Sequence, residues 1–94
     1  MKLIVGLGNP GREYKNNRHN FGFMALDSLS AHYQFEDWKS KLEGKFASKL
    51  FSSEKIILVK PQTYMNMSGI CVVKFKQFFK VSEDDIFVIY DDID

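Results

Sequence analysis

Two short apolar runs near the ends of the chain constrain its fold most. Lys2–Leu7 and Ile86–Tyr90 are almost continuously apolar, without the alternation of a half-exposed strand. Such runs are typical of strands buried on both faces of a parallel sheet. Parallel neighbours need long crossover connections, usually helical, so the residues between the two runs should supply helices.

Helical spacing occurs in two segments of that connection, residues 20–34 and 66–80. The apolar positions are Gly22, Leu26, Leu29 and Tyr33 in the first segment, and Met67, Cys71, Phe75 and Phe78 in the second. Because Cys71 falls on an apolar stripe, we expect a packed core thiol rather than a nucleophile.

Between the two predicted helices, Phe46–Phe51 and Lys55–Lys60 read as strands joined by a turn at Ser52-Ser53-Glu54. They predict a hairpin. The whole pattern is strand, helix, hairpin, helix, strand, which predicts an α/β domain of three α/β/α layers around a mixed, mostly parallel sheet. No covering helix follows the last strand, so we expect the layer to be incomplete in this chain, with its uncovered sheet prone to association.

Charge is unevenly distributed along the 94 residues. All thirteen Lys and Arg lie in residues 1–80, whereas six of the twelve acids lie in 82–94, so residues 1–81 carry +7 and residues 82–94 carry −6. A local positive field can attract a polyanion. The simpler interpretation is that Lys39, Lys41, Lys45 and Lys49 form a solvated face. A single cysteine and two histidines predict neither a disulfide framework nor a metal site, and we expect no cofactor.

Gly6-Leu7-Gly8-Asn9-Pro10-Gly11 matches the G-x-G-x-x-G pattern of dinucleotide-binding turns. A true site also needs a helix that opens inside the motif and an acid that ends a second strand about 20 residues on. Residues 12–17 lack apolar periodicity, and Glu36 and Asp37 follow a helix-like segment. The glycines more simply permit a tight turn near a ligand.

Polar residues follow three predicted strands at the point where each ends. Asn9 follows the first strand, and His19 closes the loop that it opens. Asn66 follows the strand that ends near Lys60, and Asp91 follows Tyr90. Ligands of open α/β sheets bind outside the carboxyl ends of the strands, so these four side chains should converge there.

Each of the four also has a purely structural interpretation. Asn9 is a common turn residue, Asn66 could cap a helix, Asp91 could end a strand in solvent, and His19 could be a structural loop residue. Their shared edge favours chemistry instead. A histidine can take a proton near neutral pH, a carboxylate can orient it, and amides can hold an oxyanion. With no activated Ser or Cys, water is the natural nucleophile for ester or amide hydrolysis.

Three blocks of the sequence resemble a known family. They are Lys2–Tyr14 continued by Arg18-His19-Asn20-Phe21-Gly22, then Lys60–Gly69, which reads KPQTYMNMSG, and finally Tyr90-Asp91-Asp92-Ile93-Asp94. Together they are similar to the signatures of bacterial peptidyl-tRNA hydrolase. The resemblance covers the whole chain and implies that residues 1–94 are the N-terminal part of a single domain of that family.

The resemblance also implies an activity and a set of site residues. The reaction is hydrolysis of the ester that joins a peptide to the terminal ribose of tRNA, which recycles tRNA from aborted translation in the cytoplasm. His19 would activate water and Asp91 would keep it basic and oriented. The positions that match substrate-binding and tRNA-binding residues are Asn9, Tyr14, Tyr64, Met65 and Asn66.

Family members continue beyond this point, so the resemblance implies that the isolated 94-residue chain is weakly active or inactive. The partner would be the acceptor end of peptidyl-tRNA, with no membrane, and the full-length relative would be a monomer. The alternative is a non-catalytic RNA-binding relative of the same fold, such as a splicing factor. If the chain is an enzyme, the His19 ring should lie within hydrogen-bond reach of the Asp91 carboxylate, roughly 2.6–3.2 Å away.

Overall fold

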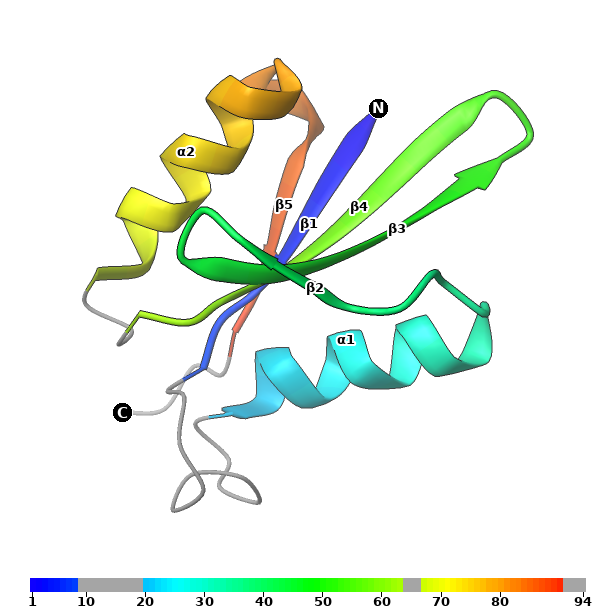
Figure 1. The fold of residues 1–94 in the computed structure, drawn as a ribbon, viewed down its shortest axis with the longest axis horizontal. Coiled ribbons are helices and arrows are strands. Elements are labelled where there is room, and N and C mark those ends of the chain that lie inside the picture. The colour runs from blue at the N-terminus through cyan, green and yellow to red at the C-terminus, as the bar shows by residue number, and fades with distance from the viewer. Residues whose placement is uncertain (9–19, 64–66, 91–94) are drawn as a thin grey trace.

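The computed structural model describes residues 1–8, 20–63 and 67–90 of the chain. Two helices and five strands follow one another, and their order is the predicted one except for an additional short strand at Lys39–Lys41 (Figure 1). They are β1 (Lys2–Gly6), α1 (Phe21–His32), β2 (Lys39–Lys41), β3 (Gly44–Phe51), β4 (Glu54–Pro61), α2 (Ser68–Phe79) and β5 (Ile86–Ile89), with a short 3₁₀ helix at Glu83–Asp85.

The five strands form one mixed sheet in the order β2-β3-β4-β1-β5. β1 lies between β4 and β5 and is parallel to both, with Val5 opposite Val59 on one side and Val88 on the other. β2, β3 and β4 are antiparallel neighbours. The predicted hairpin and the α/β class with a mixed sheet are therefore confirmed.

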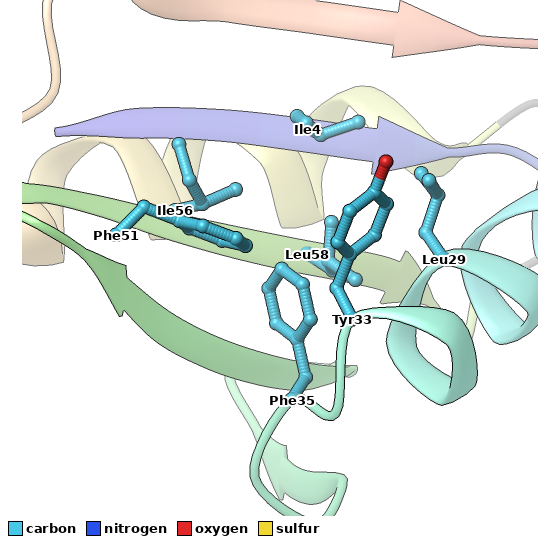
Figure 2. A pocket seen from close by; sticks show the side chains of 7 residues that line it. All are labelled: Ile4, Leu29, Tyr33, Phe35, Phe51, Ile56 and Leu58. Atoms are coloured by element: carbon cyan, nitrogen blue, oxygen red, sulfur yellow. The ribbon is translucent and has the colours of Figure 1, made fainter.

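The helices cover opposite faces of this sheet, which gives the predicted three layers. Leu3 and Val5 of β1 point to the face covered by α2, where they pack in one buried cluster with Cys71 and Phe75. Successive strand residues point to opposite faces, and Ile4 accordingly lies on the α1 side (Figure 2).

Two features of the sheet differ from the expectations. β2 was not predicted, and it pairs with β3 through a two-residue turn in which Leu42 and Glu43 both have positive φ. The expected burial of the last apolar run is wrong, because Phe87 and Val88 are 48% and 45% exposed. In the described sheet, β5 is the edge strand beside β1 (Figure 1).

Cys71 is a packed core residue, as its place on the helical stripe predicted. Its side chain is buried in the α2-side cluster. Burial raises the pKa of the Cys71 thiol to about 11, and the nearby Glu43 carboxylate acts in the same direction. The thiol is therefore neutral at physiological pH, which opposes any role as a nucleophile.

The state of Cys71 leads to a labelling prediction. At pH 8 the folded chain should react with Ellman's reagent only slowly, because the thiol is both inaccessible and protonated. In concentrated urea, one equivalent should react at the rate of a free cysteine. Rapid stoichiometric labelling of the folded chain would contradict this placement of Cys71.

Candidate active site

The carboxyl ends of three parallel strands lie side by side at one edge of the sheet. β1 ends at Gly6, which lies opposite Ile89 at the end of β5. β4, on the other side of β1, ends at Pro61. The segments that follow these strands, 9–19, 64–66 and 91–94, therefore all continue from the same edge, which is where ligands bind in open α/β sheets.

All seven predicted site residues belong to these segments and lie outside the described residues. They are Asn9, Tyr14 and His19 in 9–19, Tyr64, Met65 and Asn66 in 64–66, and Asp91 in 91–94. The described residues that flank them fix where each segment starts and where two of them end. The distances among the seven side chains remain predictions.

The segment 9–19 leaves and rejoins the described fold at the same place. A Cβ atom added to Gly8 would lie 2.7 Å from Oδ1 of Asn20. Gly8 immediately precedes Asn9, and Asn20, which is buried, immediately follows His19. The two ends of this segment are therefore neighbours, although eleven residues separate them in the sequence.

The backbone of α1 is packed directly on the strand ends. The amide of Leu7 donates a 2.9 Å hydrogen bond to the carbonyl of Ile89, which joins the ends of β1 and β5. Over this junction lies Gly22, where an added Cβ would be 2.4 Å from the Leu7 nitrogen and oxygen and 2.5 Å from the Ile89 oxygen. Only glycine permits such a close approach between a helix and strand ends.

The same contact explains the first glycine of the G-x-G-x-x-G pattern. A Cβ on Gly6 would lie 2.4 Å from the carbonyl oxygen of Gly22, so this glycine serves helix–strand packing. The next strands after α1 are β2 and β3, an antiparallel pair. A dinucleotide-binding unit would continue there into a second parallel strand, so the described topology opposes that interpretation.

The segment 64–66 is bracketed by two buried hydroxyls. Oγ1 of Thr63 and Oγ of Ser68 are both buried, and neither has a hydrogen-bond partner among the described residues. An unpaired buried hydroxyl is costly, by about 1–3 kcal/mol. Ser68 lies in the first turn of α2. Both hydroxyls are available to hold the chain between them or a polar group bound to it.

Lys60 connects the end of β4 to α1. Its Nζ lies 2.6 Å from Oδ1 of Asp27 in α1 and 4.1 Å from the centroid of the Trp38 ring, and only 13% of its side chain is exposed. The interaction combines a charge-assisted hydrogen bond with a cation–π contact. Sequence reasoning missed this cluster, because Asp27, Trp38 and Lys60 are far apart in the chain and no local pattern indicates that their side chains meet.

A second feature, an apolar pocket of 290 Å³, lies away from the strand ends (Figure 2). It lies on the α1 side of the sheet, among residues of β1, β3 and β4 and residues at and just after the end of α1. Its lining residues are Ile4, Leu29, Tyr33, Phe35, Phe51, Ile56 and Leu58. Apart from the Tyr33 hydroxyl, the described side chains that line this pocket are apolar.

Within residues 1–8, 20–63 and 67–90, no group of three or more His, Cys, Asp and Glu side chains is placed to hold a metal ion. In the same part of the chain, neither helix is long and apolar enough to span a membrane.

Comparison with known proteins identifies the family. A family model described as peptidyl-tRNA hydrolase matches residues 3–94. The chain belongs to the peptidyl-tRNA hydrolase family. Its whole length is 48% identical to the peptidyl-tRNA hydrolase of Oceanobacillus iheyensis, covering 50% of that protein, and 49% identical to that of Dinoroseobacter shibae, covering 40%.

Solved structures of the family agree with this fold. The crystal structure of peptidyl-tRNA hydrolase from Acinetobacter baumannii superposes on all of this chain with a TM-score of 0.91 at 36% identity. The match covers 48% of that protein. The chain therefore spans about half the length of the peptidyl-tRNA hydrolases that it matches.

The close contact at Gly22 predicts that a single added methyl group lowers the stability of the fold substantially. Gly22→Ala should destabilise the chain by about 2 kcal/mol, because the strand ends must move away, although alanine favours a helix. Gly69→Ala in α2 is the matched control, since a Cβ there meets nothing within 4 Å. It should stabilise the chain by about 0.5–1 kcal/mol. Urea unfolding measures both, and equal effects of the two substitutions would contradict the contact.

The Lys60 cluster predicts that removing the lysine charge lowers stability by less than Gly22→Ala does. Lys60→Met keeps most of the buried stem but removes the ion pair and the cation–π contact, so we expect a loss of about 1–2 kcal/mol in urea unfolding. Lys45→Met is the control, because Lys45 is exposed on β3 and should change stability by less than about 0.5 kcal/mol. If both lysines could be replaced at the same cost, Lys60 would not connect β4 to α1.

Proposed function

We propose that residues 1–94 form the N-terminal part of a single peptidyl-tRNA hydrolase domain, and that the complete domain cleaves the ester between peptide and tRNA. The observation that supports this most is the family match over residues 3–94 in a fold that gathers three parallel strand ends at one edge. The reaction would be that of a carboxylic ester hydrolase acting in the cytoplasm, where it would recycle tRNA after aborted translation.

His19 is the proposed general base and Asp91 its partner. The imidazole takes a proton from water as the oxygen attacks the ester carbonyl, and the carboxylate stabilises the imidazolium that forms. The imidazolium then returns the proton to the ribose oxygen that leaves. His19 immediately precedes buried Asn20, and Asp91 follows Tyr90 just beyond β5. The hydrogen bond from the Leu7 amide to the Ile89 carbonyl joins the end of β1 to the end of β5, just before Asp91.

The remaining site residues are assigned to substrate binding. Asn9 would distinguish a blocked peptidyl group from a free ammonium, and Asn66 would donate hydrogen bonds to the acceptor end. Tyr14 and Tyr64 offer rings on which unpaired bases can stack, and Met65 would line the pocket. In this proposal no metal or cofactor takes part.

The charge of the chain suits a polyanionic substrate. Residues 1–81 carry +7, and Lys39, Lys41 and Lys45 are exposed on β2 and β3. Contacts between lysines and phosphates add affinity that depends on salt but not on sequence. These lysines are nevertheless equally compatible with a solvated face, so the assignment of substrate rests on the family and not on them.

The 94-residue chain alone should hydrolyse peptidyl-tRNA weakly or not at all. It spans about half of its relatives, and its β5 edge is exposed. The test therefore uses a chimera in which residues 1–94 replace the equivalent segment of the Oceanobacillus iheyensis relative. N-acetylaminoacyl-tRNA is the substrate, and tRNA binding is measured separately by filter retention.

In this chimera, His19→Ala should lower kcat by about 10²–10⁴-fold while tRNA binding stays within about twofold. His32→Ala is the matched control, because His32 is exposed at the end of α1 and should not affect hydrolysis. Hydrolysis that survives His19→Ala would refute the proposed base. A chimera that binds tRNA without cleaving it would instead support a non-catalytic RNA-binding relative.

A further inference from the structure

Three exposed side chains form a basic and aromatic patch where β2 meets α2. Lys39 and Lys41 lie on β2, whose three residues are all exposed. The Lys41 ammonium lies 4.1 Å from the centroid of the Phe78 ring on α2, and Phe78 is 53% exposed. We call Lys39, Lys41 and Phe78 the β2–α2 patch. It lies at the edge of the sheet opposite β5 (Figure 1).

The register of the sheet places both lysines on the face that α2 covers. Lys39 lies opposite Phe46, whose ring packs against Phe75 of α2. Lys41 is two residues further along β2 and points to the same face, in agreement with its contact with Phe78. Residues two apart on a strand are separated by about 7 Å. This separation is comparable to that of successive phosphates along one strand of RNA.

The charges of the two lysines are not matched by acids. Among the described residues, neither Lys39 nor Lys41 forms an ion pair, not even with Asp37 just before β2. Glu43, in the turn that follows Lys41, is paired instead with Lys74 at 2.5 Å. The patch therefore presents two positive charges that an incoming anion can neutralise.

Two lysines beside an exposed ring fit a single-stranded nucleic acid better than other polyanions. Proteins that bind single strands combine positive groups along the phosphate backbone with aromatic side chains on which bases stack. A duplex keeps its bases stacked inside, so it would meet only the lysines. An acidic peptide would also meet only the lysines, because the face of an aromatic ring is electronegative and does not attract carboxylates.

The patch is close to the edge of the sheet where the proposed active site lies. Lys41 is the last residue of β2, and its partner Gly44 lies opposite Pro61 at the end of β4. The backbone amide of Gln62 donates a 2.9 Å hydrogen bond to the carbonyl of Glu43, in the turn after β2. A strand of RNA whose end reaches this edge can therefore continue across the patch.

We propose that the β2–α2 patch binds a single-stranded segment of RNA, with Lys39 and Lys41 on successive phosphates and one base stacked on Phe78. On binding, the Lys41 ammonium moves from the ring to a phosphate, and the base stacks in its place. The identity of that RNA, the acceptor end of peptidyl-tRNA, rests on the proposed function. Binding itself requires none of the proposed catalytic residues, so loss of RNA binding and loss of hydrolysis are separate outcomes.

The test measures binding of fluorescein-labelled octauridylate to the 94-residue chain by fluorescence anisotropy over a range of salt concentrations. Lys39→Gln/Lys41→Gln should weaken binding at least about fivefold at about 50 mM salt. It should also reduce the slope of log K against log salt by about 1.4, because each phosphate contact with a single strand contributes about 0.7.

Lys45→Gln/Lys55→Gln is the matched control, because it removes the same charge away from the patch. Lys45 lies opposite Lys60 on the α1 side of the sheet, and Lys55 lies near the start of β4. This variant should change the slope by less than about 0.5. Circular dichroism verifies that both double variants are folded.

Phe78→Leu tests the stacked base. It should weaken binding of octauridylate about threefold or more, because leucine offers no ring on which a base can stack. Binding of a labelled RNA duplex of eight base pairs should stay unchanged. Phe87→Leu on β5 is the matched control, since Phe87 is 48% exposed at the far edge of the sheet and should affect neither RNA.

Four results would overturn the proposal. Equal losses in the two double lysine variants would make Lys39 and Lys41 part of a solvated face. Equal losses of single-strand and duplex binding in Phe78→Leu would exclude a stacked base. An octaglutamate peptide that displaces octauridylate at equal concentration would show that any polyanion suffices. The fourth result is no binding of octauridylate at low salt. None of these outcomes involves His19, so hydrolysis by the chimera is decided separately.

Discussion

The parallel pairing of β1 with both β4 and β5 is the constraint on which the rest of the structure depends. It places Leu3 and Val5 in the middle of the α2-side core and puts three strand ends at one edge of the sheet. Segments that are up to about 80 residues apart in the sequence therefore start from adjacent positions. Without this pairing, a base from the first loop and an acid from the end of the chain would have no reason to meet.

The backbone contact at Gly22 holds the start of α1 directly against the same edge of the sheet. Because the first turn of α1 lies directly on Leu7 and Ile89, the loop that carries His19 must close where it opened. Lys60 connects the end of β4 to the same helix through Asp27. α1 is thus fixed to all three parallel strands, and a hydrolytic site that needs accurate placement of a proton acceptor can be built on such a support.

Much of this fold follows from the sequence, and the failures have physical causes. Unbroken apolar runs and helical spacing predicted β1, both helices and the β3–β4 hairpin. β2 escaped notice because its turn, Leu42-Glu43, adopts positive φ without the Gly or Asn that normally marks such turns. The apolar run of β5 predicted burial, yet a run looks the same whether or not another element covers it. Contacts between distant residues, such as Lys60 with Trp38, leave no local pattern. The site residues were predicted from their position after strand ends and from family resemblance, and the described structure places their neighbours.

The central claim is that His19 and Asp91 meet at the carboxyl edge of the sheet. A crystal structure of the chain that defines both side chains tests it most directly, through the distance from a ring nitrogen of His19 to the nearer carboxylate oxygen of Asp91. The account predicts a hydrogen bond of roughly 2.6–3.2 Å. Side chains that point to opposite faces of the sheet, with no common solvent-filled space between them, would contradict it.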